Sequence, residues 1–142
     1  KKKKNYLLTG FDINQKYLDF ANKYNLQKQM NIEFIKRNIE DIKFEQDIDY
    51  LISSFTLIYV KKKNLIKFFL KKKNKIKKGF ILIEYHSKKK SDNMSYYVHN
   101  FEEIFNNSNL NNFQIEFNKI NNKRWIKKDH EAYTISGHIN EN

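Results

Sequence analysis

An acidic residue stands near the start of the chain, where an apolar segment gives way to a helical pattern. The segment Tyr6–Leu8 continues through Thr9, Gly10 and Phe11 to Asp12, and apolar residues then recur at helical spacing. In doubly wound α/β sheets, ligands bind beyond the carboxyl ends of the strands, and an acid there can bind both ribose hydroxyls of a nucleoside. Asp12 is therefore a candidate nucleoside ligand. The alternative is a surface acid that caps the following helix.

Three other side chains with usable chemistry follow apolar segments later in the chain: Tyr59, Tyr85 and His86. An unperturbed histidine has a pKa of about 6.5, so His86 could act as a general base toward a hydroxyl or amine nucleophile. Tyr85 and Tyr59 are further catalytic candidates beside it. The alternative for His86 is a polar residue that ends a strand. The remaining histidines show no metal-ligand spacing, and the sequence predicts no metal site.

These candidates require strands and helices to position them. Apolar alternation or continuous apolar runs predict strands, and apolar residues three and four apart predict helices. Strands are predicted at 6–12, 31–36, 49–53 and 80–85, and helices at 15–24 and 64–75. We expect strand 49–53 to be buried on both faces, and Gly79 to form a turn with positive φ. This alternation favours a parallel sheet.

The chain changes character after His86. The stretch 98–105 suits a short helix, whereas 113–120 and 131–139 each alternate apolar and polar residues across a basic loop. The last two read as an antiparallel pair that closes one edge of the sheet. The predicted fold class is therefore α/β: a three-layer, doubly wound (Rossmann-like), mostly parallel sheet with an antiparallel C-terminal strand pair.

Composition narrows the class of protein. The 142 residues suggest a single domain, and the absence of cysteine excludes disulfides, thiolate metal sites and cysteine nucleophiles. No apolar run approaches the roughly 20 residues of a membrane span, and no signal-peptide pattern opens the chain, so we expect a cytoplasmic protein. The net charge of +12 favours anionic partners such as RNA. Scattered lysines, scarce arginine and abundant asparagine favour a general compositional bias instead.

With these elements in order, the sequence resembles the class I S-adenosylmethionine-dependent methyltransferases. TGFDINQKYLDFANKY is similar to the family's second strand and following helix, which implies that Asp12 binds the ribose of the cofactor and that Ile13 beside it also contacts the cofactor. IEFIKRNIEDI is similar to the third strand and adenine loop, where Asn38 replaces the usual Asp and Ile39 could pack on the ring. DIDYLISSFTLIYV is similar to the fourth strand, which implies that Ser54 and Phe55 face the cofactor.

The resemblance has departures. IKKGFILIEYH is similar to the family's fifth strand and preceding turn, but Lys78 and Phe80 replace a Pro and a Gly. The family's Gly-rich loop and first strand are missing, because only Lys1–Asn5 precede the first visible strand. That strand normally lies between the second and fourth, so we expect two sub-sheets with unpaired inner edges. We expect residues 1–142 to be one domain that lacks about 30 to 60 upstream residues, enough for a strand and a helix.

The resemblance implies an enzyme that uses S-adenosyl-L-methionine to methylate an O, N or C nucleophile of a small-molecule substrate. Two alternatives remain. One is a basic nucleic-acid-binding protein without catalysis, which the net charge suggests. The other is a pseudo-enzyme that keeps the methyltransferase fold, which Asn38, Lys78 and the missing loop suggest.

Overall fold

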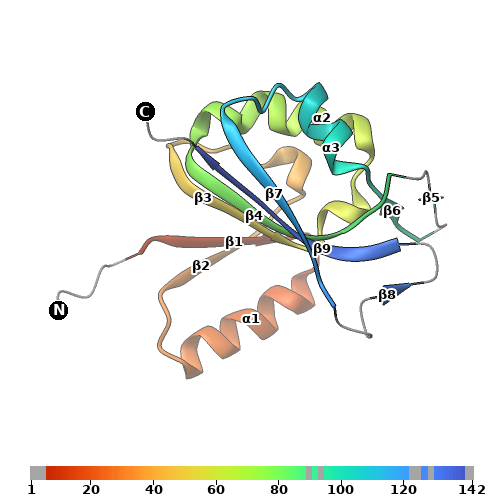
Figure 1. The fold of residues 1–142 in the computed structure, drawn as a ribbon. Helices are drawn as coiled ribbons and strands as arrows, with labels where there is room; N and C mark the ends of the chain where they lie inside the picture. The colour runs from red at the N-terminus through yellow and green to blue at the C-terminus, as the bar shows by residue number, and fades with distance from the viewer. Residues whose placement is uncertain (1–5, 89–90, 93–94, 122–125, 128–129, 140–142) are drawn as a thin grey trace. The chain divides into compact units, whose positions relative to one another are not determined.

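A computed structural model describes residues 6–88, 91–92, 95–121, 126–127 and 130–139 of the chain (Figure 1). The chain divides into two compact units, Lys1–Lys43 and Phe44–Asn142. Each unit carries its own β-sheet, and the two are therefore taken in turn.

The first unit is a strand–helix–strand element. Its parts are β1 (Leu8–Asp12), α1 (Gln15–Gln27), β2 (Ile32–Lys36) and the 3-10 helix η1 (Ile39–Asp41). β1 and β2 pair in parallel, from Leu8 opposite Ile32 to Asp12 opposite Lys36. The strand and helix assignments for this part of the chain are thereby confirmed. A short 3-10 helix, η1, forms in the segment after β2.

The apolar stripe of α1 is buried less than its spacing suggests. Leu18 is buried, whereas Tyr17, Phe20 and Tyr24 are exposed although they share the helical pattern. A two-stranded sheet offers little surface for a helix to cover, because two strands span only about 5 Å between their axes. The periodicity therefore predicts the helix correctly but overestimates its buried face.

The second unit holds most of the chain. Its main elements are β3 (Ile48–Ser54), η2 (Leu57–Tyr59), α2 (Lys62–Lys72), η3 (Lys73–Lys75), β4 (Ile76–His86), α3 (Phe101–Asn107), β7 (Phe113–Lys119) and β9 (His130–Ile139). Shorter strands are β5 (Ser91–Asp92), β6 (Tyr97–Val98) and β8 (Ile126–Lys127). The main sheet has the order β3-β4-β9-β7, with β8 also paired to β9.

Strand direction in this sheet is mixed. β3 and β4 are parallel, whereas β9 runs antiparallel to both β4 and β7. The α/β class is confirmed, and so is the antiparallel pairing of 113–120 with 131–139. Parallel pairing is a smaller share of the sheet than expected, because β9 inserts between β4 and β7 and reverses direction against each. The separation of β1–β2 from β3–β4 agrees with the expected sub-sheets.

An aromatic core joins two helices to one face of this sheet. Phe69 on α2 contacts Phe80 on β4 and Phe105 on α3, with ring centroids 6.1 and 5.5 Å apart. The ring centroid of Phe80 also lies 5.3 Å from that of Phe105 and 5.4 Å from that of Phe113 on β7. Figure 1 shows α2 and α3 together on this face. The predicted helix 64–75 thus buries Phe69 as its apolar spacing requires.

The opposite face of β3 corrects one prediction. Leu51 is in register with buried Phe80, so its side of the strand faces the helices. Alternate residues point to the other side, and there Tyr50 and Ile52 are exposed. The strand is therefore half-buried on the face that it shares with Phe80 and exposed on the other, and not buried on both.

Gly79 corrects a second prediction. It lies inside β4 opposite His138, and it does not have the positive φ expected for a turn. A Cβ atom at Gly79 would lie 2.2 Å from the carbonyl oxygen of Gly137 on β9. The glycine therefore permits close approach of two strands, and β4 extends through the predicted turn to Ile76.

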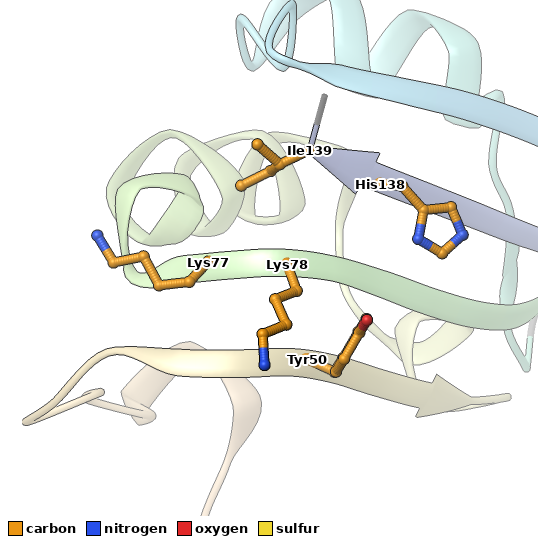
Figure 2. A pocket seen from close by; sticks show the side chains of 5 residues that line it. All are labelled: Tyr50, Lys77, Lys78, His138 and Ile139. Carbon is orange, nitrogen blue, oxygen red and sulfur yellow. The ribbon is translucent and has the colours of Figure 1, made fainter. Parts of the chain in front are cut away.

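A hollow of about 250 Å³ lies at the amino ends of β3 and β4 (Figure 2). It is lined by Tyr50, Lys77, Lys78, His138 and Ile139. Lys78 reaches from β4 toward β3 and forms an ion pair of 3.0 Å with Asp49. Lys77 pairs with Asp47 at 3.1 Å. Acidic partners thus offset the two lysines, so the hollow is not a concentrated positive site.

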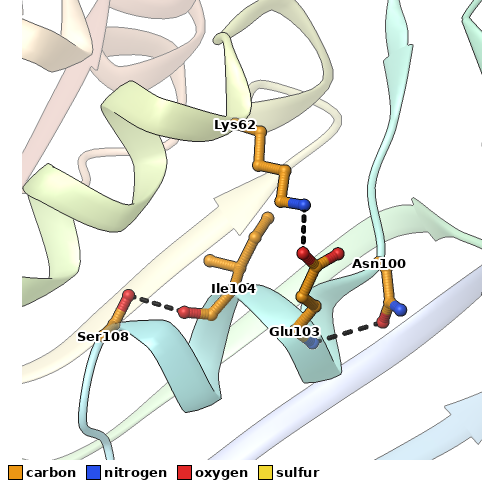
Figure 3. A network of polar contacts seen from close by, with 5 residues as sticks. All are labelled: Lys62, Asn100, Glu103, Ile104 and Ser108. Carbon is orange, nitrogen blue, oxygen red and sulfur yellow. Dashed lines mark hydrogen bonds and ion pairs between the residues drawn. The ribbon is translucent and has the colours of Figure 1, made fainter.

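Polar contacts fix α3 beside α2 (Figure 3). Asn100 caps α3 by accepting a hydrogen bond from the Glu103 N–H at 3.3 Å. The Glu103 carboxylate pairs with Lys62 on α2. At the other end, the buried Ser108 hydroxyl donates to the Ile104 carbonyl at 2.7 Å. These contacts cap α3 and tie it to α2.

Candidate functional site

In the first unit, the predicted cofactor residues gather at one edge of the sheet. Asp12 ends β1 opposite Lys36, and the Arg37 N–H donates to the Asp12 carbonyl at 2.9 Å. Asn38 follows directly. The carboxyl ends of the two parallel strands therefore bring Asp12 and Asn38 to the same edge, as the fold class predicts.

Asp12 has a defined local geometry. Its Oδ1 accepts a hydrogen bond from the Asn14 N–H at 2.7 Å, while Asn14 itself caps α1 by accepting from the Lys16 N–H at 3.0 Å. The capping role considered for Asp12 thus falls to Asn14. A carboxylate has about four lone-pair sites and this bond occupies one. The acceptors that remain fit the chemistry of a ribose with two vicinal hydroxyls.

Asn38 has a local role as well. Its Oδ1 accepts from the Glu40 N–H at 3.1 Å and so caps η1. The amide oxygen retains a second lone pair and the amide nitrogen two donors, so contact with an adenine ring is chemically open. Of the neighbouring apolar candidates, Ile39 is half-buried and Ile13 is exposed. An exposed isoleucine beside an acid suits one face of a flat ligand.

In the second unit, the end of β3 turns sharply. Ser54 is exposed, and Phe55 adopts a positive φ of 48°. The Phe55 N–H donates to the Ile83 carbonyl on β4 at 2.8 Å, which holds the turn against the sheet. The Phe55 ring lies 5.0 Å from that of Tyr85 at 60°. The structure therefore brings Phe55 and Tyr85 together at the carboxyl ends of β3 and β4.

Tyr85, at this edge, is a poor general base. The pKa of Tyr85 is raised first by burial and then by the phenol groups of Tyr96 and Tyr59. The rings of Tyr85 and Tyr96 lie 5.8 Å apart, while Tyr59 is mainly exposed. A phenol with a raised pKa keeps its proton at neutral pH, so Tyr85 is suited to donate a hydrogen bond and not to remove a proton.

His86 is buried inside an aromatic cluster. Its Nδ1 accepts from the Phe101 N–H at 3.2 Å, at the first turn of α3. The rings of Phe117 and Tyr133 lie 5.0 and 5.1 Å from the imidazole. Burial is the largest influence on its pKa and lowers it. This geometry suits a neutral side chain that joins β4 to α3, which agrees with the structural alternative for His86.

Sequence reasoning missed the group with the most perturbed acidity. Glu84 is fully buried on β4, and burial raises its pKa to about 7. Its Oε1 accepts from the Ser53 hydroxyl at 2.9 Å and from the N–H groups of Thr56 and Leu57, each at 3.2 Å. The available signal was an acid at the core-facing position of the apolar strand 80–85, two residues after Leu82.

Two other kinds of site are not found in the described parts of the chain. No three histidine, cysteine or carboxylate side chains there form a group that could hold a metal ion. None of the helices described is long and apolar enough to cross a membrane. The candidate residues are the polar and aromatic groups at the carboxyl ends of β1 and β2 in the first unit, and those at the carboxyl ends of β3 and β4 in the second.

Sequence comparison gives one family match. A family described as "Methyltransferase domain" matches residues 1–79, which is more than half of the chain. That range includes Asp12, Asn38, Ser54 and Phe55. A comparison with curated proteins found no significant match.

Solved structures of methyltransferases share the fold. An S-adenosylmethionine-dependent methyltransferase from Clostridium acetobutylicum has a TM-score of 0.69 at 12% identity, covering 96% of this chain and 76% of its own. Magnesium protoporphyrin IX methyltransferase from Synechocystis, with bound S-adenosylmethionine, has a TM-score of 0.70 at 14% identity. The match covers 96% of this chain and 61% of that protein. An O-methyltransferase from Brevibacillus brevis, in complex with S-adenosylhomocysteine, has a TM-score of 0.72 at 10% identity. The match covers 94% of this chain and 58% of that protein.

Proposed function

We infer the function from one premise, namely that this chain belongs to the methyltransferase domain family. S-adenosylmethionine is the cofactor of that family. We propose that the protein binds S-adenosylmethionine and transfers its methyl group to an O, N or C nucleophile of a small-molecule substrate.

The observation that carries this proposal is the position of Asp12. It ends β1 beside Asn38, and it keeps carboxylate acceptors for a ribose after bonding to Asn14. We assign the ribose hydroxyls to Asp12, and the adenine ring to Ile13, Asn38 and Ile39. When bound, S-adenosylmethionine supplies a methyl group on a sulfonium that leaves as a neutral thioether.

In the second unit, we propose that Ser54 and Phe55 also contact the cofactor. Their turn is fixed by the Phe55 N–H bond to the Ile83 carbonyl and by ring contact with Tyr85. A backbone held in one conformation before the ligand arrives loses less entropy on binding. These residues are therefore suited to orient a cofactor and to exclude water from one side of it.

A dedicated general base is not part of the proposal. Methyl transfer from a sulfonium depends mainly on alignment and desolvation of the nucleophile. His86 accepts a backbone hydrogen bond at Nδ1 and is almost fully buried, and the raised pKa of Tyr85 keeps its phenol protonated. We propose that these two side chains shape the acceptor side of the site. The nucleophile then attacks either as its anion, or as a neutral group that releases its proton to solvent after it has received the methyl group.

The two alternatives remain open to test. A basic nucleic-acid-binding protein would lose RNA affinity steeply with salt. Lysines such as Lys77, Lys78 and Lys119 are engaged by carboxylates in the structure, which weakens this case. A pseudo-enzyme would keep the fold without being stabilised by the cofactor.

The direct test is calorimetric titration of S-adenosylhomocysteine into wild-type protein and Asp12→Ala. Hydrogen bonds to a charged partner are worth about 1.5–3 kcal/mol, so we expect the variant to bind about 10- to 100-fold more weakly. Asp19→Ala is the matched control, since Asp19 is an exposed acid on α1 that accepts a bond from Gln15. It should bind like wild type.

Each result has a clear consequence. Selective loss of affinity in Asp12→Ala would establish the cofactor site. Equal affinity in both variants would remove Asp12 from it. A folded wild-type protein that does not bind S-adenosylhomocysteine would overturn the proposed function.

A further inference from the structure

Glu84 is an acid inside the core of the second unit that the proposed chemistry leaves unused. It lies on the face of β4 that carries Phe80 and Leu82, and its side chain is fully buried. Three hydrogen bonds converge on Oε1 of the carboxylate, from the Ser53 hydroxyl and from the N–H groups of Thr56 and Leu57. Oε2 is buried without a hydrogen-bond partner among the described residues. A buried acid of this kind requires an explanation beyond packing.

The start of η2, which Glu84 contacts, has no cap from its own N-cap side chain. Thr56 is the N-cap residue of η2, and the first N–H groups of a helix have no partner within it. An N-cap threonine usually accepts one of these hydrogens with its own side chain, but the Thr56 hydroxyl donates to the Ser54 carbonyl instead. Glu84, 28 positions later in the sequence and on the adjacent strand β4, acts as the acceptor in place of the Thr56 side chain.

A second contact holds the same turn from its other side. The Leu57 N–H donates to Glu84, while the Leu57 carbonyl lies 3.1 Å from Nε2 of His99. A carbonyl can only accept, so that nitrogen carries the proton. His99 is itself buried against Phe101. The turn after β3 is therefore clamped at Leu57 between two side chains that come from later elements.

We propose that Glu84 is a positioning residue that sets the conformation of the turn 54–58 and thereby presents Ser54 and Phe55 to the cofactor. The cofactor part of this inference rests on the proposed function. The positive φ of Phe55 supports it, because a non-glycine residue in that region needs surrounding contacts to keep it there. Glu84 supplies those contacts to the next two residues along the chain.

The inference predicts a link between the turn and protonation. In the closed turn the carboxyl is buried and its pKa is raised by that burial to about 7, whereas an opened turn would hydrate it and return it toward 4.5. The closed turn therefore binds the proton more tightly. By linkage, it is most stable below pH 4.5 and loses that advantage as the pH rises through about 7.

Other ionisable groups surround this carboxyl and define the controls. Tyr133 on β9 is paired with Glu84 in register, and His86 lies two residues along the same face of β4. His99 contacts the far side of the turn, and Tyr59 lies on η2. β3 contributes Ser53, which does not ionise in this range. Replacing Glu84 alone, with these groups intact, separates its titration from theirs.

The first measurement is amide hydrogen exchange of ligand-free protein between pH 5 and pH 7. In wild type we expect the protection factors of the Thr56 and Leu57 amides to fall by more than about tenfold, after correction for intrinsic exchange. In Glu84→Gln, which keeps an acceptor but cannot ionise, we expect a change of less than about threefold. The Ile104 amide, bonded to the Asn100 carbonyl in α3, is the internal reference.

The second measurement is calorimetric titration of S-adenosylhomocysteine at pH 6 into wild type, Glu84→Gln and Glu84→Ala. We expect Glu84→Gln to bind within about threefold of wild type, and Glu84→Ala to bind more than about tenfold more weakly. Ser108→Ala is the matched control, because it also removes a buried side-chain hydrogen bond in this unit, at the end of α3. It should bind like wild type.

The outcomes separate the two proposals. Flat protection of Thr56 and Leu57 in wild type, or full affinity in a folded Glu84→Ala, overturns the role of Glu84. A wild-type protein without affinity for S-adenosylhomocysteine overturns the proposed function and the cofactor part of this inference. In that case the exchange measurement still decides whether Glu84 sets the turn.

Discussion

The two units of the chain use aromatic residues in opposite ways. In residues 44–139, Phe69, Phe80 and Phe105 are buried and contact one another between two helices and a sheet. In residues 6–43, Phe20 and Tyr17 follow an equally regular helical spacing but are exposed. The difference shows that periodicity selects the helix, while the size of the facing sheet decides how much of it is buried.

The test with the largest expected effect on stability replaces one phenylalanine in each unit. Phe80→Ala should lower the free energy of unfolding by about 3–5 kcal/mol, because it empties a fully buried site beside the rings of Phe69, Phe105 and Phe113. Phe20→Ala on α1 should change it by less than about 0.5 kcal/mol, because the ring is 72% exposed. Urea denaturation followed by circular dichroism measures both. Similar losses in the two variants would contradict the contrast.

The second test concerns the buried acid. The folded-state pKa of Glu84 is raised from 4.5 to about 7, so the folded protein binds that proton more tightly than the unfolded chain. The stability it contributes is present below pH 4.5 and is lost as the pH rises through about 7, by up to about 3 kcal/mol. The difference in unfolding free energy between wild type and Glu84→Gln should follow this curve. A difference independent of pH would show that the carboxyl titrates normally.

The third test compares two glycines. Gly79→Ala places a Cβ atom 2.2 Å from a backbone carbonyl oxygen on β9, which cannot move without separating the strands, and should cost about 1–3 kcal/mol. Gly10→Ala places one 2.7 Å from the ring of Phe34, a half-buried side chain that can turn away. It should cost less. Thermal unfolding of the two variants gives the order, and a larger shift for Gly10→Ala would reverse the interpretation.

The smallest test compares helix caps. Asn14→Ala should destabilise α1 by about 1 kcal/mol, since it removes the acceptor for the Lys16 N–H. We expect faster amide exchange in the first turn of α1. Asn100→Ala removes the equivalent cap of α3, but Phe101 and Ile104 are fully buried and hold that helix to the sheet. Exchange in α3 should therefore change less than in α1.

The strands and helices could be predicted because their patterns are local. Leu51 and Phe80 lie in continuous apolar runs, and Leu65, Phe68 and Phe69 recur at helical spacing. Gly79 was wrongly expected in a turn, because its role depends on Gly137, a residue 58 positions away that lies on the adjacent strand. Local rules for glycine do not include such partners.

The candidate site residues also differ in how far local sequence pattern could predict them. Asp12 and Asn38 could be placed at strand ends from the pattern alone, and the structure sets them at one edge. Their contact with a cofactor remains a prediction. Glu84 could not be assigned a role from sequence, because its partners Thr56 and Leu57 come from another strand connection. An acid in an apolar strand signals a buried group but not what it binds.

The central place of β9 has a consequence for synthesis on the ribosome. β3 and β4 leave the exit tunnel before β9 and can pair with each other, but one edge of β4 stays open until residues 130–139 have emerged. β7 emerges earlier than β9 and pairs with it rather than with β4. Pairing over such sequence distances is slow, and an open strand edge invites association with other chains. The nascent protein is therefore most in need of chaperones until β9 has emerged and paired with β4.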